Sequence, residues 1–112
     1  MKTTQLTEYN TAVFELEGRF DAHSTSELSE WLDTYQNSRS PNIVVDLSRV
    51  RFIDSTALAT LVKGLKRCRE NGMEFRLCGI QTPVRIIFEL TRLDKAFPVF
   101  EDRKAAMEGL KA

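Results

Sequence analysis

The sequence is poor in the residues that build metal centres and disulfide-bonded scaffolds. Its only histidine is His23, and its two cysteines, Cys68 and Cys78, are too far apart for a Cys-x-x-C motif. A zinc site or a redox pair therefore lacks a ligand set, and two isolated thiols are typical of a reducing compartment. We expect a cytoplasmic protein that holds no metal and no cofactor.

Long hydrophobic runs and an excess of one charge are also missing. The longest aliphatic stretch, residues 43–45, ends at Asp46, whereas a membrane span needs about 20 apolar residues. Residues 1–5 lead into polar positions and not into the apolar core of a secretion signal. Sixteen basic residues balance sixteen acidic ones, so no net field attracts the chain to nucleic acid or to an anionic membrane. Neither is expected as a partner.

Glycine and proline are sparse, with five and three residues among 112, and neither a linker nor an internal repeat divides the chain. The length is close to the commonest size of one domain, and 42% hydrophobic residues suffice for one core. Residues 1–112 are therefore expected to form a single domain.

Strand and helix patterns alternate along the chain. Alternating or continuous apolar runs predict strands at residues 12–17, 43–47, 74–78 and 97–100, with Gly18 ending the first and a weaker partner around 5–8. Apolar residues spaced by three and four predict helices at about 26–37, 58–69, from Pro83 onward, and 102–110. This order favours an α/β fold: a mixed, mostly parallel β-sheet with four α-helices.

Two finer features concern side chains. Ser24 and Glu27 fit a capping box at the start of the first helix, whose apolar stripe ends at Tyr35. The large aromatic residues are expected in the core: Phe52, Phe75, Phe88, Phe97 and Phe100.

Motifs of the common enzyme classes are missing. The chain has no G-x-S-x-G elbow, no H-E-x-x-H and no glycine-rich phosphate loop, and no second residue near His23 suggests a catalytic triad. His23 is interpreted as a solvated loop residue, and no enzymatic activity is expected.

Three capping-type residues stand in a row where a strand-like segment meets the clearest helix: Asp54, Ser55 and Thr56. Helix capping needs one of them. A hydroxyl at the positive end of a helix is also a place that tolerates a phosphate, so Ser55 is a candidate for phosphorylation as well as for capping.

The sequence resembles a known family, the STAS domain of bacterial anti-sigma factor antagonists. The resemblance runs from about residue 12 to 110, and its most specific part is the Asp-Ser-Thr stretch within residues 52–61. Residues 18–21 and 43–50, together with the turn at 79–84, add to it.

The resemblance implies a partner-switching module. In its unphosphorylated form the protein is expected to bind an anti-sigma factor that is also a serine kinase. That kinase is expected to phosphorylate Ser55 and so dissociate the complex, and a metal-dependent serine phosphatase to reset it. Expected partner contacts are at Asp54, Thr56, Ala57, Asp21 and Ser24.

Ala57 departs from the family pattern, which usually has glycine there. A glycine lets a partner's backbone approach closely, whereas alanine adds a methyl group and favours the helix. The Asp-Ser pair is retained.

Two other classes of function stay open. One is a small-ligand module with a pocket for a nucleotide or a lipid, and the other is a scaffold component; neither uses phosphorylation. The basic residues of the second helix are interpreted as a solvated face: Lys63, Lys66, Arg67 and Arg69.

Overall fold

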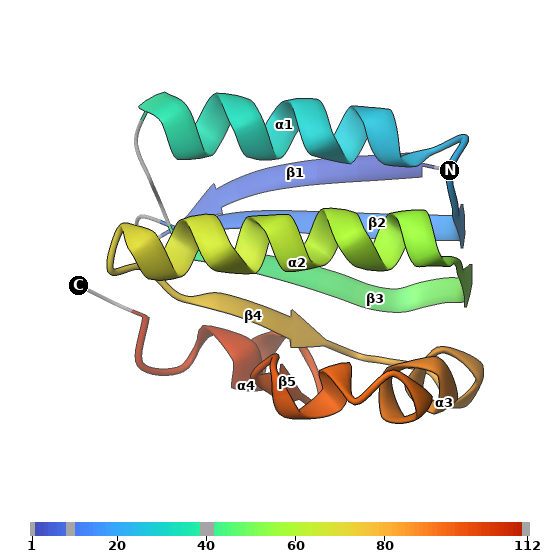
Figure 1. The fold of residues 1–112 in the computed structure, drawn as a ribbon. Helices are drawn as coiled ribbons and strands as arrows, with labels where there is room; N and C mark the ends of the chain where they lie inside the picture. Colours follow the sequence, from blue (N-terminus) through green and yellow to red (C-terminus); the bar gives the residue numbers. More distant parts are fainter. Residues whose placement is uncertain (1, 9–10, 39–41, 111–112) are drawn as a thin grey trace.

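The computed structural model describes the backbone of residues 2–8, 11–38 and 42–110, and the side chains of residues 11–34 and 42–110. Five strands form one sheet in the order β1-β2-β3-β4-β5 (Figure 1). Strand β1 (Lys2–Glu8) is antiparallel to β2 (Thr11–Phe20), and the remaining neighbours are parallel. The predicted mixed, mostly parallel sheet is confirmed.

The third strand is longer than its sequence pattern predicts. Strand β3 runs over Asn42–Ile53, and its pairing with β2 shifts register twice. At each shift β3 takes one residue more than β2, so its later core residues, Val50 and Ile53, follow Leu47 at steps of three. This spacing breaks the period of two by which a strand is recognised.

The same shifts correct two predictions. Gly18, with φ of 97°, lies at the second shift and does not end β2, which continues to Phe20. Phe52 is turned outward and is 38% exposed, so it is not a core residue.

The helices follow the predicted order. Helix α1 covers Thr25–Ser38 and α2 covers Ser55–Glu70. After β4 (Phe75–Cys78) come α3 (Thr82–Leu90), with Pro83 in its first turn, and the 3₁₀ turn η1 (Leu93–Lys95). Strand β5 (Val99–Phe100) and α4 (Arg103–Met107) complete the order, both shorter than predicted. Tyr35 lies outside the described side chains.

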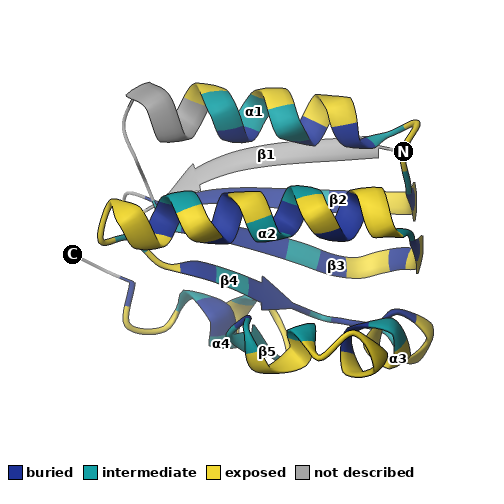
Figure 2. Ribbon diagram, viewed as in Figure 1, coloured by how far each residue is buried: buried dark blue, intermediate teal, exposed yellow. Residues whose placement is uncertain are grey.

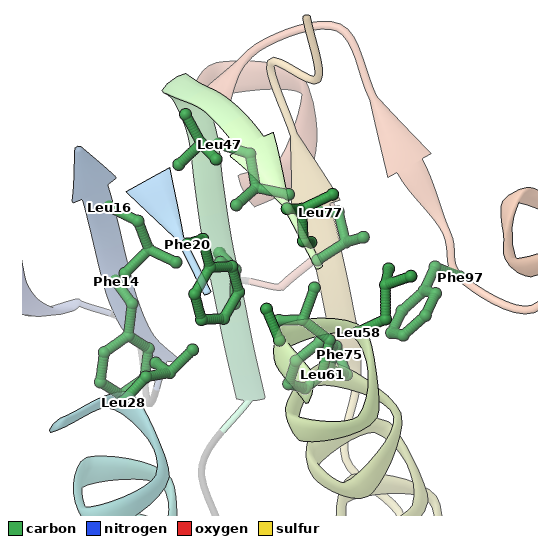
Figure 3. Packing of buried hydrophobic residues seen from close by; sticks show 14 of the residues in the cluster. Phe14, Leu16, Phe20, Leu28, Leu47, Leu58, Leu61, Phe75, Leu77 and Phe97 are labelled. Atoms are coloured by element: carbon green, nitrogen blue, oxygen red, sulfur yellow. The ribbon is translucent and has the colours of Figure 1, made fainter. Parts of the chain in front are cut away.

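Two apolar clusters cover the two faces of the sheet. The larger joins alternate strand residues, such as Phe14, Leu47 and Leu77, to residues of α1, α2 and α3 such as Leu28 and Leu61 (Figure 3). On the opposite face a smaller cluster joins the strands to Ala106 and Leu110 at the C-terminal end. The first half of β3 is buried on both faces, whereas its second half, which leads to α2, is exposed on one face (Figure 2).

Candidate functional site

The start of α2 is fixed by Asp54, the residue between β3 and the helix. Its backbone is extended, with φ of −112° and ψ of −179°, which is typical of an N-cap. Oδ1 of Asp54 accepts a hydrogen bond from the backbone N–H of Ala57 at 2.9 Å. The carbonyl of Asp54 accepts the first helical bond from Leu58 at 3.0 Å. Asp54 is therefore the cap of α2.

The same carboxylate holds a second segment. Oδ2 of Asp54 accepts a hydrogen bond from the backbone N–H of Ala22, in the loop between β2 and α1, at 2.9 Å. The backbone N–H of Asp54 donates to the carbonyl of Phe20 at 3.3 Å. Because β2 and β3 are parallel, their carboxyl ends meet at one edge of the sheet, and Asp54 joins the loop to the helix there.

The loop has its own network, centred on Asp21. Oδ1 of Asp21 accepts from the backbone N–H of His23 at 3.1 Å and from the hydroxyl of Ser24 at 3.2 Å. Oδ2 lies 3.5 Å from Nε of Arg19. Burial favours the neutral carboxyl, but the His23 amide, the Ser24 hydroxyl and Arg19 together outweigh it, so the pKa of Asp21 is lowered.

Ser24 closes this loop and does not form the predicted capping box. Its hydroxyl donates to the carbonyl of Arg19 at 2.9 Å and accepts from the backbone N–H of Asp21 at 3.0 Å. The hydroxyl is thereby turned back toward β2, away from the amide of Glu27. The prediction was wrong because the loop offers Ser24 nearer partners.

Ser55 and Thr56 lie beside Asp54 with free side chains. Both residues are exposed. Within the described residues, no hydrogen bond joins either hydroxyl, or either backbone N–H, to a protein partner. Since Asp54 provides the cap, the interpretation of Ser55 as a capping residue is wrong. Its hydroxyl is held on the surface at the positive end of a helix.

Ala57 differs from its neighbours, because it is fully buried in the larger cluster. Its methyl group points into the core, and its backbone N–H belongs to the cap. A molecule that approaches this turn meets Ser55 and Thr56, so Ala57 has no exposed side chain with which to make the predicted contact.

A groove runs from Ser55 along α2. We call it the α2 groove; it has a volume of about 500 Å³, and its lining consists of Ser55, Leu58, Ala59, Val62, Lys63, Lys66 and Leu93. Leu93 belongs to η1, and every other residue belongs to α2. The sequence pattern did not reveal this groove, because its second wall comes from a short 3₁₀ turn with no periodic signal.

Arg19 is a further residue that sequence reasoning missed. Its guanidinium carbon lies 3.9 Å above the centre of the Phe52 ring, in a cation–π contact. Arg19 therefore ties the outward-facing end of β3 to Asp21 and its loop. The register shifts between β2 and β3 create this contact, and they are not visible in the sequence.

The thiols and the acidic groups show no metal-binding arrangement. No group of three or more histidine, cysteine or acidic side chains that could hold a metal ion occurs in the described part of the chain. Cys68 and Cys78 are buried and are not joined by a disulfide bond. Burial, reinforced by the charge of Asp46, raises the pKa of Cys78 to about 12.

The described helices are all too short or too polar to span a membrane.

Comparison with known proteins identifies the family to which this chain belongs. The family model described as the STAS domain matches residues 3–106. The chain belongs to the STAS domain family. It is 31% identical over 84 residues to an anti-sigma-B factor antagonist of Staphylococcus aureus, which covers 75% of this chain and 78% of that protein. The resemblance inferred from the sequence is thereby confirmed.

Solved structures share the STAS fold. An anti-sigma factor antagonist from Mycobacterium paratuberculosis superposes with a TM-score of 0.87 at 23% identity, covering 99% of this chain and 94% of that one. The Bacillus cell fate determinant SpoIIAA in its phosphorylated form superposes with a TM-score of 0.78 at 16% identity, covering 96% and 97%. At these identities the likeness shows the fold.

Proposed function

We propose that this STAS domain is an anti-sigma factor antagonist that works by partner switching. The unphosphorylated protein binds an anti-sigma factor that is also a serine kinase. Phosphorylation of Ser55 by that kinase dissociates the complex, and a metal-dependent serine phosphatase restores the binding form. The family and the names of its relatives support the antagonist role.

The observation that carries the proposal is that Asp54, and not Ser55, caps α2. Asp54 caps the helix with one carboxylate oxygen and holds the Ala22 loop with the other. Ser55 is thereby left exposed, with no protein partner for its hydroxyl among the described residues. A kinase can modify such a hydroxyl without breaking a bond that the fold needs.

A phosphate at Ser55 changes the surface more than the fold. It adds about 1.5 to 2 negative charges at pH 7. The N–H groups of the first helical turn and the positive end of the helix dipole stabilise an anion there. SpoIIAA, which shares the fold, occurs in a phosphorylated form, and this supports the proposal.

The contact surface of the proposed partner surrounds Ser55. Thr56 is exposed beside it and is a second hydroxyl within reach of a kinase. Asp54 holds Ala22 against the helix end, so Asp21 and Ser24 lie next to the modified turn. We assign these residues to partner contact, and Ala57 to positioning through its N–H.

Site-resolved mass spectrometry on protein purified from its native cells tests the proposal. Wild type, Ser55→Ala and Thr56→Ala are compared under growth and under stress. We expect a condition-dependent phosphate on Ser55 that persists in Thr56→Ala and disappears in Ser55→Ala. If Ser55 stays unmodified in every condition, the proposal fails, and a small molecule found in the native mass spectrum would favour the ligand-binding alternative.

A further inference from the structure

The α2 groove combines an apolar floor with positive charge. Leu58, Ala59 and Val62 form the floor, with Leu93 on the other side. At the rise of 1.5 Å per residue of a helix, Ser55 and Lys66 are separated by about 16 Å along the axis. The groove is therefore long enough for about three turns of a second helix.

Two lysines at one end have no acidic partner. Lys63 and Lys66 are exposed, and neither forms an ion pair with any described residue. Other basic residues of α2 are engaged within the molecule. Arg67 pairs with Asp33, and Arg69 donates to the carbonyl of Ala96 at 2.9 Å. Of the four basic residues predicted to form a solvated face of α2, only Lys63 and Lys66 match that prediction.

The opposite end of the groove presents backbone N–H groups, because Ser55 lies at the N-terminus of α2. The helix dipole places a partial positive charge there. Two carboxylates lie near that end: Asp54, whose oxygens accept hydrogen bonds from Ala57 and Ala22, and Asp21, which is paired with Arg19. An occupant therefore meets two lysines at one end, the N–H groups of the first helical turn at the other, and apolar side chains between them.

We propose that the α2 groove binds an acidic amphipathic helix of the partner protein. Apolar side chains of that helix, spaced by three and four residues, fill the groove, as in other helix-in-groove complexes. Its carboxylates pair with Lys63 and Lys66. This inference rests on the proposed function, since it describes the segment of the anti-sigma factor kinase that binds near Ser55.

The groove gives the switch a physical cause. Ser55 is part of the lining, so a phosphate on its hydroxyl lies at the Ser55 end of the groove. It adds about 1.5 to 2 negative charges at that end and repels an acidic occupant. Removal of the phosphate restores the attraction.

A charge-reversal experiment tests the groove. The dissociation constant of the complex with the anti-sigma factor kinase from the same cells is measured for wild type and for the double variant Lys63→Glu/Lys66→Glu. The matched control is Arg85→Glu/Lys104→Glu, which makes the same change in net charge at two exposed residues outside the groove. We expect binding weaker by about tenfold or more in the groove variant and changed by less than about twofold in the control.

A photo-crosslinker identifies the occupant. Benzoylphenylalanine replaces Ala59 in the groove or, as the control, Ala105 in α4, and the crosslinked partner peptide is sequenced. We expect a crosslink from position 59 alone, to a segment with acidic residues beside apolar ones at helical spacing. A basic segment, or no crosslink, overturns the proposal.

The outcomes separate the groove from the switch. If Ser55→Glu releases the kinase while the groove variant binds as tightly as the control, partner switching stands and the groove proposal is wrong. If wild type itself does not bind the kinase, the proposed function fails and the groove proposal fails with it. Circular dichroism of each variant confirms that the comparison is made between folded proteins.

Discussion

Asp54 is the residue on which the geometry of the site depends. Its carboxylate accepts from the N–H groups of Ala57 and Ala22, each at 2.9 Å. Loss of an N-cap costs about 1 kcal/mol, and loss of one further hydrogen bond about 1 kcal/mol. We expect Asp54→Ala to lower the free energy of unfolding by about 2 kcal/mol in urea titrations followed by Trp31 fluorescence.

Asp102 provides the control for this prediction. It caps α4 with one hydrogen bond, from the N–H of Ala105 at 2.8 Å, so Asp102→Ala should cost about 1 kcal/mol. Equal losses in the two variants would show that the bond to Ala22 contributes nothing.

Asp21 should make the free energy of unfolding depend on pH. Its folded-state pKa is lowered, so its contribution is complete above the unfolded-state pKa of about 4 and disappears as the pH falls through the lower folded value. We expect the difference in free energy of unfolding between wild type and Asp21→Asn to shrink as the pH falls from about 5 to about 3. Asp94→Asn, at an exposed residue with no described ion pair, is the matched control for removing a surface carboxyl group.

The buried thiols should be inert in the folded protein. Burial raises the pKa of Cys78 to about 12, so its thiolate fraction at pH 8 falls by about 10³-fold relative to a free thiol. We expect a thiol reagent at pH 8 to modify Cys78 at least about 10³-fold more slowly in the native protein than in guanidinium. Rapid native labelling mapped to Cys78 would contradict the burial that the structure shows.

For single residues, the sequence identified the candidate site but not the structural role of each side chain in it. The Asp-Ser-Thr stretch indicated both capping and phosphorylation, and the family resemblance is confirmed. That Asp54 caps while Ser55 is exposed depends on the backbone angles at Asp54. That Ala57 faces the core depends on the direction in which α2 leaves β3.

Among the elements, α2 approaches β4 and α1 closely at Gly64. A Cβ atom on Gly64 would lie 2.7 Å from Cε2 of Phe75 in β4 and 3.3 Å from Cδ1 of Leu32 in α1. Alanine gains about 1 kcal/mol of helix propensity over glycine, whereas overpacking costs about 1 to 3 kcal/mol.

Because the cost of overpacking exceeds the gain in helix propensity, we expect Gly64→Ala to lower the free energy of unfolding, by up to about 2 kcal/mol. Differential scanning calorimetry should show a lower Tm. A rise in Tm would mean that α2, α1 and β4 pack less tightly than the structure shows. The exposed Ala59→Gly variant calibrates the propensity of the same helix and should cost about 1 kcal/mol.

Periodic elements were predicted well and irregular ones poorly. Helix α2 and the buried half of β3 have strong patterns, and both are confirmed. The second half of β3 was missed, because two register shifts place its core residues three apart. Strand β5 pairs with β4 over two residues and helix α4 ends at Met107, so both are shorter than predicted.

For the whole molecule, the fold places the exposed hydroxyls of Ser55 and Thr56 at an edge that is otherwise held by hydrogen bonds. The parallel sheet brings the ends of β2 and β3 together, and Asp54 fastens the loop of Asp21 to α2. The mixed, mostly parallel sheet followed from the sequence pattern, whereas the order of its strands comes from the structure. The α2 groove did not, since it needs η1 to approach α2 in three dimensions.

The most direct test of partner switching is calorimetric titration of the anti-sigma factor kinase with this protein, unmodified and with phosphoserine incorporated at position 55. The account predicts that the unmodified protein binds and that the phosphate weakens binding by about 10- to 100-fold. Equal affinity of the two forms would contradict the account at its centre.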